Sequence, residues 1–120
     1  IDVVDADRTL VGGLIAPGLR LFPKALNLAT SRLPEVEIAL PDRIIQNTTV
    51  GSLQSGIVYG YLGMVESLLA RVKKENGADN YRIIATGGSA QFVADNSTCI
   101  DVVDRNLTLD GLRRLHERLS

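Results

Sequence analysis

Two adjacent glycines, in Thr86-Gly87-Gly88, stand where a short apolar run gives way to the start of a helix. The run Ile83-Ile84-Ala85 predicts a buried strand, and the following helix is expected from Ser89. Because glycine has no Cβ, backbone N–H groups at such a turn can come close to a ligand. A helix start adds positive potential. The combination suits a phosphate or a nucleotide, although a Gly-Gly pair after a strand is also common as a plain tight turn.

Two further segments have a similar character. The stretch from Gly12-Gly13 through Pro17-Gly18 is a second strand end framed by glycines. Asn47-Thr48-Thr49 places an amide and two hydroxyls at the start of a long helix. Hydroxyls and free N–H groups at a helix N-terminus suit an anionic or polar ligand. Asn47 or Thr48 can equally serve as the helix cap, and capping and ligand binding are compatible.

The other reactive side chains do not form a catalytic set. The one histidine, His116, lies among arginines on the last expected helix and is predicted to be solvated. The one cysteine, Cys99, cannot form an internal disulfide and is predicted to be a buried thiol. No Cys/His spacing supports a zinc site.

Bulk properties define the class of protein. The length of 120 residues predicts one domain over residues 1–120, and 45% apolar residues fit a globular core. The net charge of −1 and pI near 5.8 give no basic face for nucleic acid or an anionic membrane. No apolar run reaches the roughly 18 residues that span a bilayer. We therefore expect no nucleic-acid partner, no membrane partner and a cytoplasmic location.

The elements that must position these motifs follow from periodicity and turn signals. A hairpin, a helix, a long helix and two strand–helix units predict an α/β fold, with helices on both faces of a mixed sheet. The expected strands are 1–4, 10–15, 81–85 and 99–103, and the expected helices are 19–30, 48–76, 89–94 and 107–119. Gly12 and Gly13 predict a bulge or a close backbone approach within the hairpin, and residues 36–38 an extended connector or short edge strand.

The long helix presents two distinct faces. Its predicted apolar stripe consists of Leu53, Ile57, Tyr61, Val65, Leu68 and Val72. Another face is small, with Ser52, Gly56 and Gly60 at every fourth position and Gly63 close by. Each interior glycine costs about 1 kcal/mol relative to alanine, so a compensating contact is expected. Either another helix packs closely there, or a ligand or partner subunit lies against that face.

In this order, the three motifs resemble the C-terminal half of a type III pantothenate kinase. The closing stretch from Ile100 to Leu112 fits that family as well, so the resemblance runs essentially from end to end. It implies a single actin-like (ribonuclease H-like) domain. It also implies an ATP-dependent enzyme that phosphorylates pantothenate in the first step of coenzyme A biosynthesis.

The resemblance implies roles for individual residues. Thr49 would contact pantothenate, with Thr48 as the alternative if the register shifts by one, because Thr48 stands where the family usually has Asn. The wall of the pantothenate pocket would be shaped by Gly12, Gly13, Pro17 and Gly18. The segment Thr86, Gly87 and Gly88 would lie along the nucleotide.

The same resemblance implies that the catalytic parts lie elsewhere. The family's first phosphate loop, its catalytic aspartate and neighbouring arginine, and the aspartate that binds a monovalent cation would all precede Ile1. We therefore expect no catalytic residue, no bound cofactor and no turnover from this chain alone. The complete enzyme would use Mg²⁺ with ATP and a monovalent cation, K⁺ or NH₄⁺. It would be a homodimer, with helix 48–76 as the candidate interface.

Two other interpretations stay open. One is a non-enzymatic homologue that acts as an accessory factor in transcriptional regulation by binding a protein partner. The other is an isolated structural half, excised or designed to test whether one such domain folds alone. The chain has no initiator Met and opens on the strand-like Ile1-Asp2-Val3-Val4, which favours a fragment.

Overall fold

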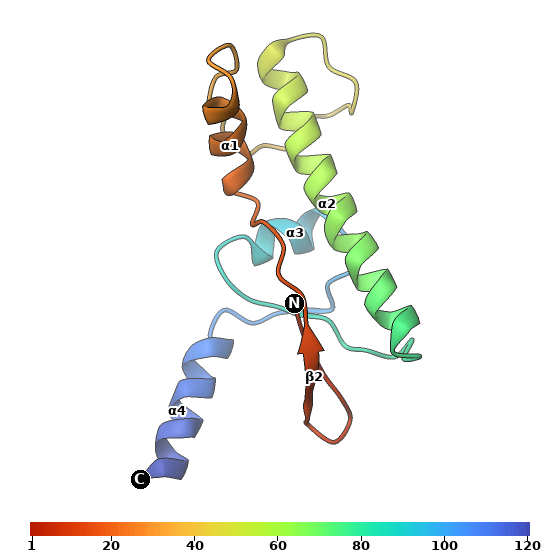
Figure 1. The fold of residues 1–120 in the computed structure, drawn as a ribbon, viewed down its shortest axis with the longest axis vertical. Coiled ribbons are helices and arrows are strands. Elements are labelled where there is room, and N and C mark those ends of the chain that lie inside the picture. Colours follow the sequence, from red (N-terminus) through yellow and green to blue (C-terminus); the bar gives the residue numbers. More distant parts are fainter.

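The computed structural model describes residues 1–120 as an α/β arrangement of helices and short strands (Figure 1). Each helix lies within a few residues of its predicted span, because periodicity and caps are local signals. None of the helices has both the length and the apolar content that crossing a bilayer requires. The elements are β1 (Asp2–Val4), β2 (Leu10–Gly13), α1 (Leu21–Ala29), α2 (Thr49–Glu75), β3 (Ile84–Ala85), α3 (Ala90–Asn96), β4 (Val102–Val103) and α4 (Leu107–Leu119).

Strands β1 and β2 form the predicted antiparallel hairpin. Asp2 lies opposite Gly13, and the register then shifts at Val4, where the pairing is irregular. A Cβ on Gly13 would overlap the carbonyl oxygen of Ile1, so only glycine permits this approach. The expectation of a bulge or close backbone approach at this glycine pair is confirmed.

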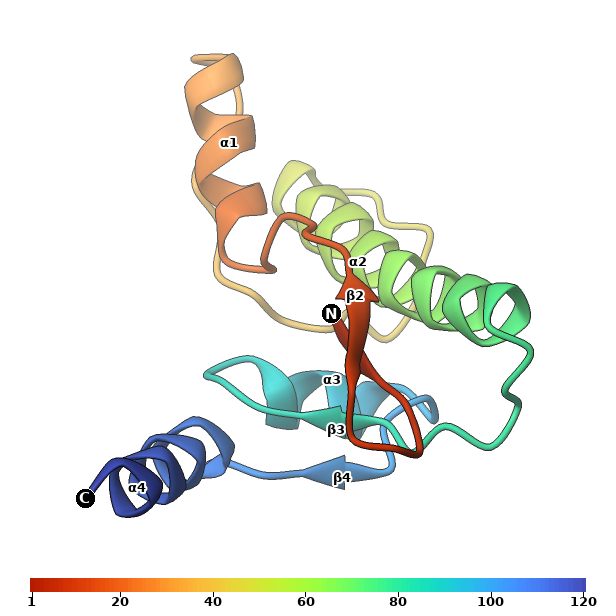
Figure 2. The same ribbon diagram turned by 60° about the horizontal axis from the view of Figure 1, so that its bottom comes forward.

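The predicted single mixed sheet is wrong. β1 and β2 form one two-stranded sheet, and β3 pairs in parallel with β4 in another. Figure 2 shows the hairpin running crosswise to the β3–β4 pair. The second pair is also shorter than the apolar runs predicted, since the carboxylate of Asp101 accepts the N–H of Ile83 at 2.6 Å. That side-chain bond ends the regular ladder where the sequence predicted more strand. No strand forms at residues 36–38 either.

Helix α2 carries the core, but its buried face differs from the predicted stripe. Ile57 is buried as expected, whereas the other five stripe residues are only half-buried. The core cluster is formed by Val58 and Leu62, which pack with Val93 of α3. Apolar residues also lie beside the predicted stripe, so the covering elements decide which of them are buried. Those elements are α3 and the loop that precedes α2.

That loop is fastened across α2 by side chains of the helix. The Tyr59 hydroxyl donates to the carbonyl oxygen of Pro41 at 2.9 Å, and the Gln54 amide donates to that of Glu37 at 3.1 Å. The buried Ser55 hydroxyl donates to the carbonyl oxygen of Ile44. Helix α1 adds an edge-to-face contact between Phe22 and Tyr61, with ring centroids 6.1 Å apart. These bonds hold the segment that leads into the start of α2.

The small face of α2 has no partner within this chain. Ser52, Gly56, Gly60 and Gly63 are exposed, and a Cβ on any of these three glycines would meet no atom within 4 Å. The interpretation that another helix of the chain packs closely there is therefore wrong. A contact between subunits through this face stays a prediction.

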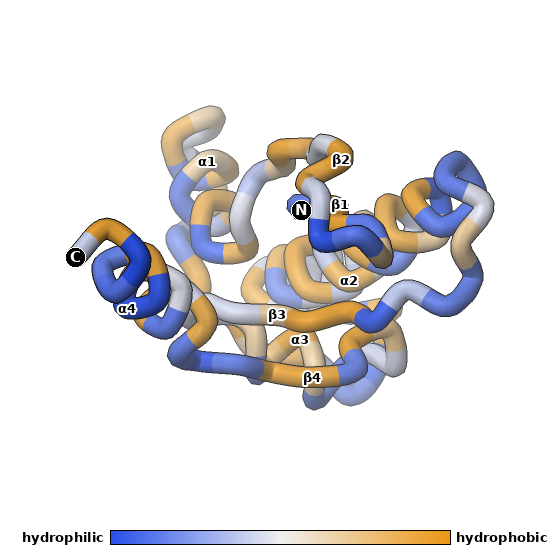
Figure 3. Tube along the Cα trace, turned by 90° about the horizontal axis from the view of Figure 1, so that it is seen from below, coloured by the Kyte–Doolittle hydropathy of each residue, from blue (hydrophilic) through white to orange (hydrophobic).

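Hydrophobic and hydrophilic residues are distributed unevenly over the elements. Figure 3 shows hydrophobic segments along β3 and β4 and a mixture of hydrophobic and hydrophilic segments around α4. Helix α4 has no buried residue, and His116 on it is exposed as predicted. Cys99, predicted to be buried, is a half-buried free cysteine whose sulfur accepts a hydrogen bond from the Ser97 hydroxyl at 3.0 Å.

Candidate ligand-binding site at the start of α2

An open pocket of about 450 Å³ lies at the N-terminal end of α2. Its volume is in the range of small-molecule sites. No charged side chain contributes to its lining, which combines polar groups with two leucines. The lining residues are Leu33, Gln46, Asn47, Thr48, Thr49, Ser52 and Leu53.

The two threonines at this helix start have different positions. Thr48 is the N-cap, with extended backbone, and its hydroxyl oxygen accepts the N–H of Gly51 at 3.0 Å. Thr49 is the first helical residue, and its exposed hydroxyl has no partner within the chain. Thr48 is thus occupied by the cap, while Thr49 is free to contact a ligand in the pocket.

Free backbone donors accompany the hydroxyl. The N–H groups of Thr49 and Val50 have no acceptor in the chain, as expected for the first turn of a helix. Helix α2 has 27 residues, so these donors stand at the positive end of a long row of aligned peptide dipoles. The helix start can therefore bind an anionic or strongly polar group.

Gly51 shapes this site, although the sequence analysis gave it no role. A Cβ at Gly51 would lie 2.7 Å from Oε1 of Gln46 and 2.9 Å from Oγ1 of Thr48. Glycine thus lets the preceding loop fold against the first helical turn. Gly51 lies three positions after the capping residue, where the cap accepts a backbone N–H, but any residue can donate there and the spacing does not indicate glycine.

The glycine loop Thr86-Gly87-Gly88 connects β3 to α3 and is exposed throughout. Gly87 has a φ of 97°, which favours glycine. The N–H groups of Gly88 and Ser89 have no acceptor in the chain. Helix α3 has only seven residues, so the N–H donors of the loop contribute more to attracting an anionic ligand than the dipole of this helix does.

Arg20 brings a positive charge to the glycine loop. One of its guanidinium nitrogens lies 3.9 Å from the position that a Cβ on Gly88 would take. Arg20 forms no ion pair with a carboxylate of the chain. The neighbouring Leu19, only 2% exposed, anchors the segment that carries it. Sequence reasoning missed this residue, because its contact with the loop joins distant parts of the chain.

The residues predicted to contact pantothenate are not gathered in one place. Gly12 and Gly13 lie in the hairpin, and Pro17 and Gly18 lie between β2 and α1. None of these four lines the pocket that contains Thr48 and Thr49. In Figure 1 the start of α2 lies toward one end of the longest axis, and the hairpin toward the other. The glycine loop also lies outside that pocket.

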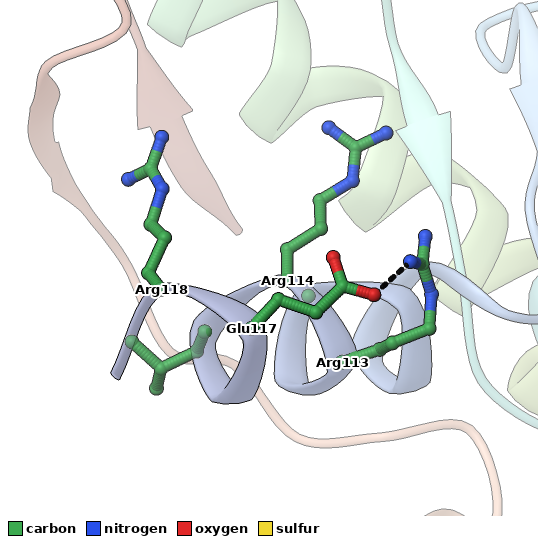
Figure 4. Close-up of a pocket in the computed structure, with 6 residues that line it drawn as sticks. Arg113, Arg114, Glu117 and Arg118 are labelled. Carbon is green, nitrogen blue, oxygen red and sulfur yellow. Dashed lines mark hydrogen bonds and ion pairs between the residues drawn. The ribbon is translucent and has the colours of Figure 1, made fainter. Parts of the chain in front are cut away.

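A wider hollow of about 740 Å³ runs along α4 (Figure 4). It is lined by side chains of that one helix, including Arg114 and Arg118, so no second element helps to form a site. Arg113 pairs with Glu117 at 2.6 Å and approaches Asp110 at 3.9 Å, and all three are exposed. Exposed pairs of this kind contribute little stability. Nowhere does the chain group three or more His, Cys, Asp or Glu side chains as a metal would require.

Free backbone donors at a long helix start and at a glycine loop are features that suit small polar or anionic ligands. The sequence model of the type III pantothenate kinase family matches residues 1–71. Curated relatives named type III pantothenate kinase come from Geotalea uraniireducens, 50% identical over 117 residues, and Paramagnetospirillum magneticum, 44% identical over 119 residues. The chain therefore belongs to the type III pantothenate kinase family.

The matched share of this chain differs from the matched share of its relatives. These relatives match 98% and 99% of this chain, whereas the chain covers 45% of each relative. A third relative, from Geobacter sp. (strain M21), is 46% identical, with 98% of this chain and 46% of the relative covered. The chain thus spans about half the length of its curated relatives and corresponds to their C-terminal part.

A solved structure has a similar fold. It is a Baf family protein from Campylobacter jejuni, described as a transcriptional activator, with a TM-score of 0.64 and 20% sequence identity. The similarity covers 98% of this chain and 51% of that one. At this identity the similarity concerns the fold alone.

Proposed function

We propose that this chain is the substrate-binding C-terminal half of an ATP-dependent pantothenate kinase. The complete polypeptide would transfer the γ-phosphoryl group of ATP to the hydroxyl of pantothenate, the first step toward coenzyme A. Family membership supports the reaction. The observation that carries the substrate role is the free hydroxyl of Thr49 in a pocket where Thr48 already serves as the cap.

The pocket at the start of α2 matches the chemistry of pantothenate. That molecule has a carboxylate, an amide, hydroxyls and a branched apolar centre. The unpaired N–H groups of Thr49 and Val50 suit the carboxylate or another polar end. Leu33 and Leu53 offer apolar contact. The glycines of the hairpin region and the Pro17-Gly18 turn lie outside this pocket, so their place in its wall stays a prediction from the resemblance.

The glycine loop and Arg20 suit the nucleotide. Free N–H groups at Gly88 and Ser89 and an unpaired guanidinium offer hydrogen-bond donors and positive charge to phosphate oxygens. Phosphoryl transfer depends mainly on positioning and charge stabilisation, so a domain that positions substrates is a sensible part of such an enzyme. We assign no catalytic residue to this chain.

The remaining features of the proposal concern the complete enzyme. It would have an actin-like fold, reside in the cytoplasm and use Mg²⁺ with ATP and K⁺ or NH₄⁺. We assign none of these ions a ligand here, because the chain gathers no suitable group of side chains. A homodimer would form through the long helix, residues 48–76, where the face of Ser52, Gly56 and Gly60 is open.

A pair of matched substitutions in the complete kinase tests the substrate role. Thr49→Val should weaken pantothenate binding about two- to tenfold, the loss of one hydrogen bond, with little change in melting temperature. Thr48→Val should instead reduce the free energy of unfolding by about 1 kcal/mol, because the cap is lost. Titration calorimetry and thermal melts measure both. If only Thr48→Val loses pantothenate binding, the substrate contact is Thr48 and the assignment is wrong by one residue. If both variants bind pantothenate normally, the substrate role of this helix start is refuted.

A further inference from the structure

Helix α4 is the one long element that packs against nothing substantial. None of its 13 residues is buried, and it makes no extensive contact with any other helix or strand. In Figures 1 and 2 it projects away from the rest of the molecule, beyond β4. A helix of this length is marginal in water by itself, and helices in proteins are stabilised mostly by packing of an apolar face.

The sequence of α4 provides such a face. Leu112, Leu115 and Leu119 follow the spacing i, i+3, i+7, which places them on one side of the helix. They are 58%, 53% and 79% exposed. We call these three residues the leucine face of α4. The charged residues Asp110, Arg113, Arg114 and Glu117 lie on the other side.

The whole molecule is more open than its size predicts. Its accessible surface is 8999 Å², whereas a compact protein of 12.9 kDa has about 6,300 Å². The radius of gyration is 17.2 Å, against about 13.6 Å for a compact domain of this length. Exposed large apolar residues also occur on the hairpin and before α2, as at Leu10, Ile15 and Ile45. Only a large additional protein surface could cover apolar residues that are scattered in this way.

A second copy of the chain is a poor occupant for the leucine face. Helix α4 is about 20 Å long, and three leucines on each of two helices would bury only a few hundred Å². Stable association of separate molecules usually needs more than about 1,000 Å². A segment of the same polypeptide does not lose translational freedom when it docks, so a small contact is sufficient.

We propose that the leucine face of α4 packs against the part of the kinase polypeptide that the curated relatives carry beyond the match to this chain. That part is more than half of each relative, large enough to cover α4 and other exposed apolar residues. The solved structure with a similar fold likewise extends beyond the matched half. The inference rests on family membership and is independent of the proposed substrate site.

The test is co-expression of this chain with the unmatched N-terminal part of the Geotalea uraniireducens relative. We expect the two to purify together, with the amides of residues 107–119 exchanging at least about tenfold more slowly than in the chain alone. The double substitution L112E/L115E should abolish both effects. The control R114Q/R118Q changes the net charge equally but spares the leucine face, so it should abolish neither. Unchanged exchange in α2 would show that each variant is folded.

Three outcomes would overturn the inference. They are failure of the unsubstituted pair to purify together, retention of the complex by L112E/L115E, and protection of α4 in the chain alone as its concentration rises. The last outcome, with a dimer in sedimentation, would assign the face to a second copy. None of these readouts measures kinase activity or pantothenate binding, so they can fail or succeed separately from the proposed function.

Discussion

At the start of α2, a threonine and a glycine contribute in different ways. The hydroxyl oxygen of Thr48 accepts the N–H of Gly51, and the absence of a side chain on Gly51 leaves room for Gln46. A Cβ on Gly51 would therefore require the Thr48 and Gln46 side chains to shift. The free hydroxyl of Thr49 is available only because this arrangement holds the first turn in place.

We expect Gly51→Ala to destabilise the chain, since the new methyl group would press against Thr48 and Gln46. The expected loss is about 1 kcal/mol, the usual value of an N-cap, and thus several degrees in melting temperature. Gly60→Ala is the matched control on the same helix. Its Cβ meets no atom, so it should raise stability by up to about 1 kcal/mol. Thermal melts of the 120-residue chain compare the two. A stabilising Gly51→Ala would show that the cap geometry does not depend on glycine.

Local signals made part of the site predictable at this scale. Capping preference identified Thr48 as a candidate cap, and the structure confirms it. Arg20 could not be found in the same way. Its contact with the loop at Gly88 depends on how the start of α1 is placed against the β3–α3 connection. That is a property of the tertiary fold.

At the scale of elements, the loop between β3 and α3 combines three properties that suit phosphate. It has unpaired N–H donors, a backbone conformation that needs glycine at Gly87, and the Arg20 guanidinium beside Gly88. The two glycines differ in what they tolerate. Only Gly87 has the positive φ, so a substitution there would mix backbone strain with any effect on binding.

Gly88→Ala in the complete kinase is therefore the cleaner probe of the nucleotide role. The nearest atom to its Cβ is a flexible arginine nitrogen at 3.9 Å, so the fold should be unaffected. If ATP runs along this loop, the methyl group should raise the Michaelis constant for ATP several-fold at an unchanged melting temperature. Gly87→Ala is the comparison, with an expected loss of about 1–2 kcal/mol in stability from its left-handed conformation. An unchanged Michaelis constant for ATP in Gly88→Ala would show that the loop is a structural turn with no role in nucleotide binding.

Helices were predictable from the sequence, and sheets were not. The bounds of α2 and α4 follow from periodicity, and the start of α2 also from the Thr48 cap, signals that act within a few residues. The β3–β4 pair depends on non-local bonds, and the Asp101 side chain shortens it in a way that the apolar runs do not reveal. Ile57 is buried as predicted, but the core of α2 is centred beside the predicted stripe, at Val58 and Leu62. Tertiary contacts choose between such neighbouring apolar positions.

The whole molecule is open, and its strands form two separate pairs in place of the predicted single sheet. The hairpin and the β3–β4 pair share no strand, and no third strand of the chain joins either of them. Two-stranded sheets are only marginally stable without further packing. Relatives of about twice the length have additional chain that can supply such packing.

Kinase activity is expected only from the complete polypeptide. We expect the 120-residue chain alone to show no pantothenate kinase activity. The resemblance places the catalytic aspartate and first phosphate loop outside it, and the pocket of Thr49 does not include the glycine loop of Gly88. An ATP-hydrolysis assay coupled to pantothenate, at high protein concentration, measures this. The chain co-expressed with the unmatched part of a relative is the positive control. Turnover of about 1 s⁻¹ or more by the chain alone, as in ordinary kinases, would show that its own residues carry the chemistry.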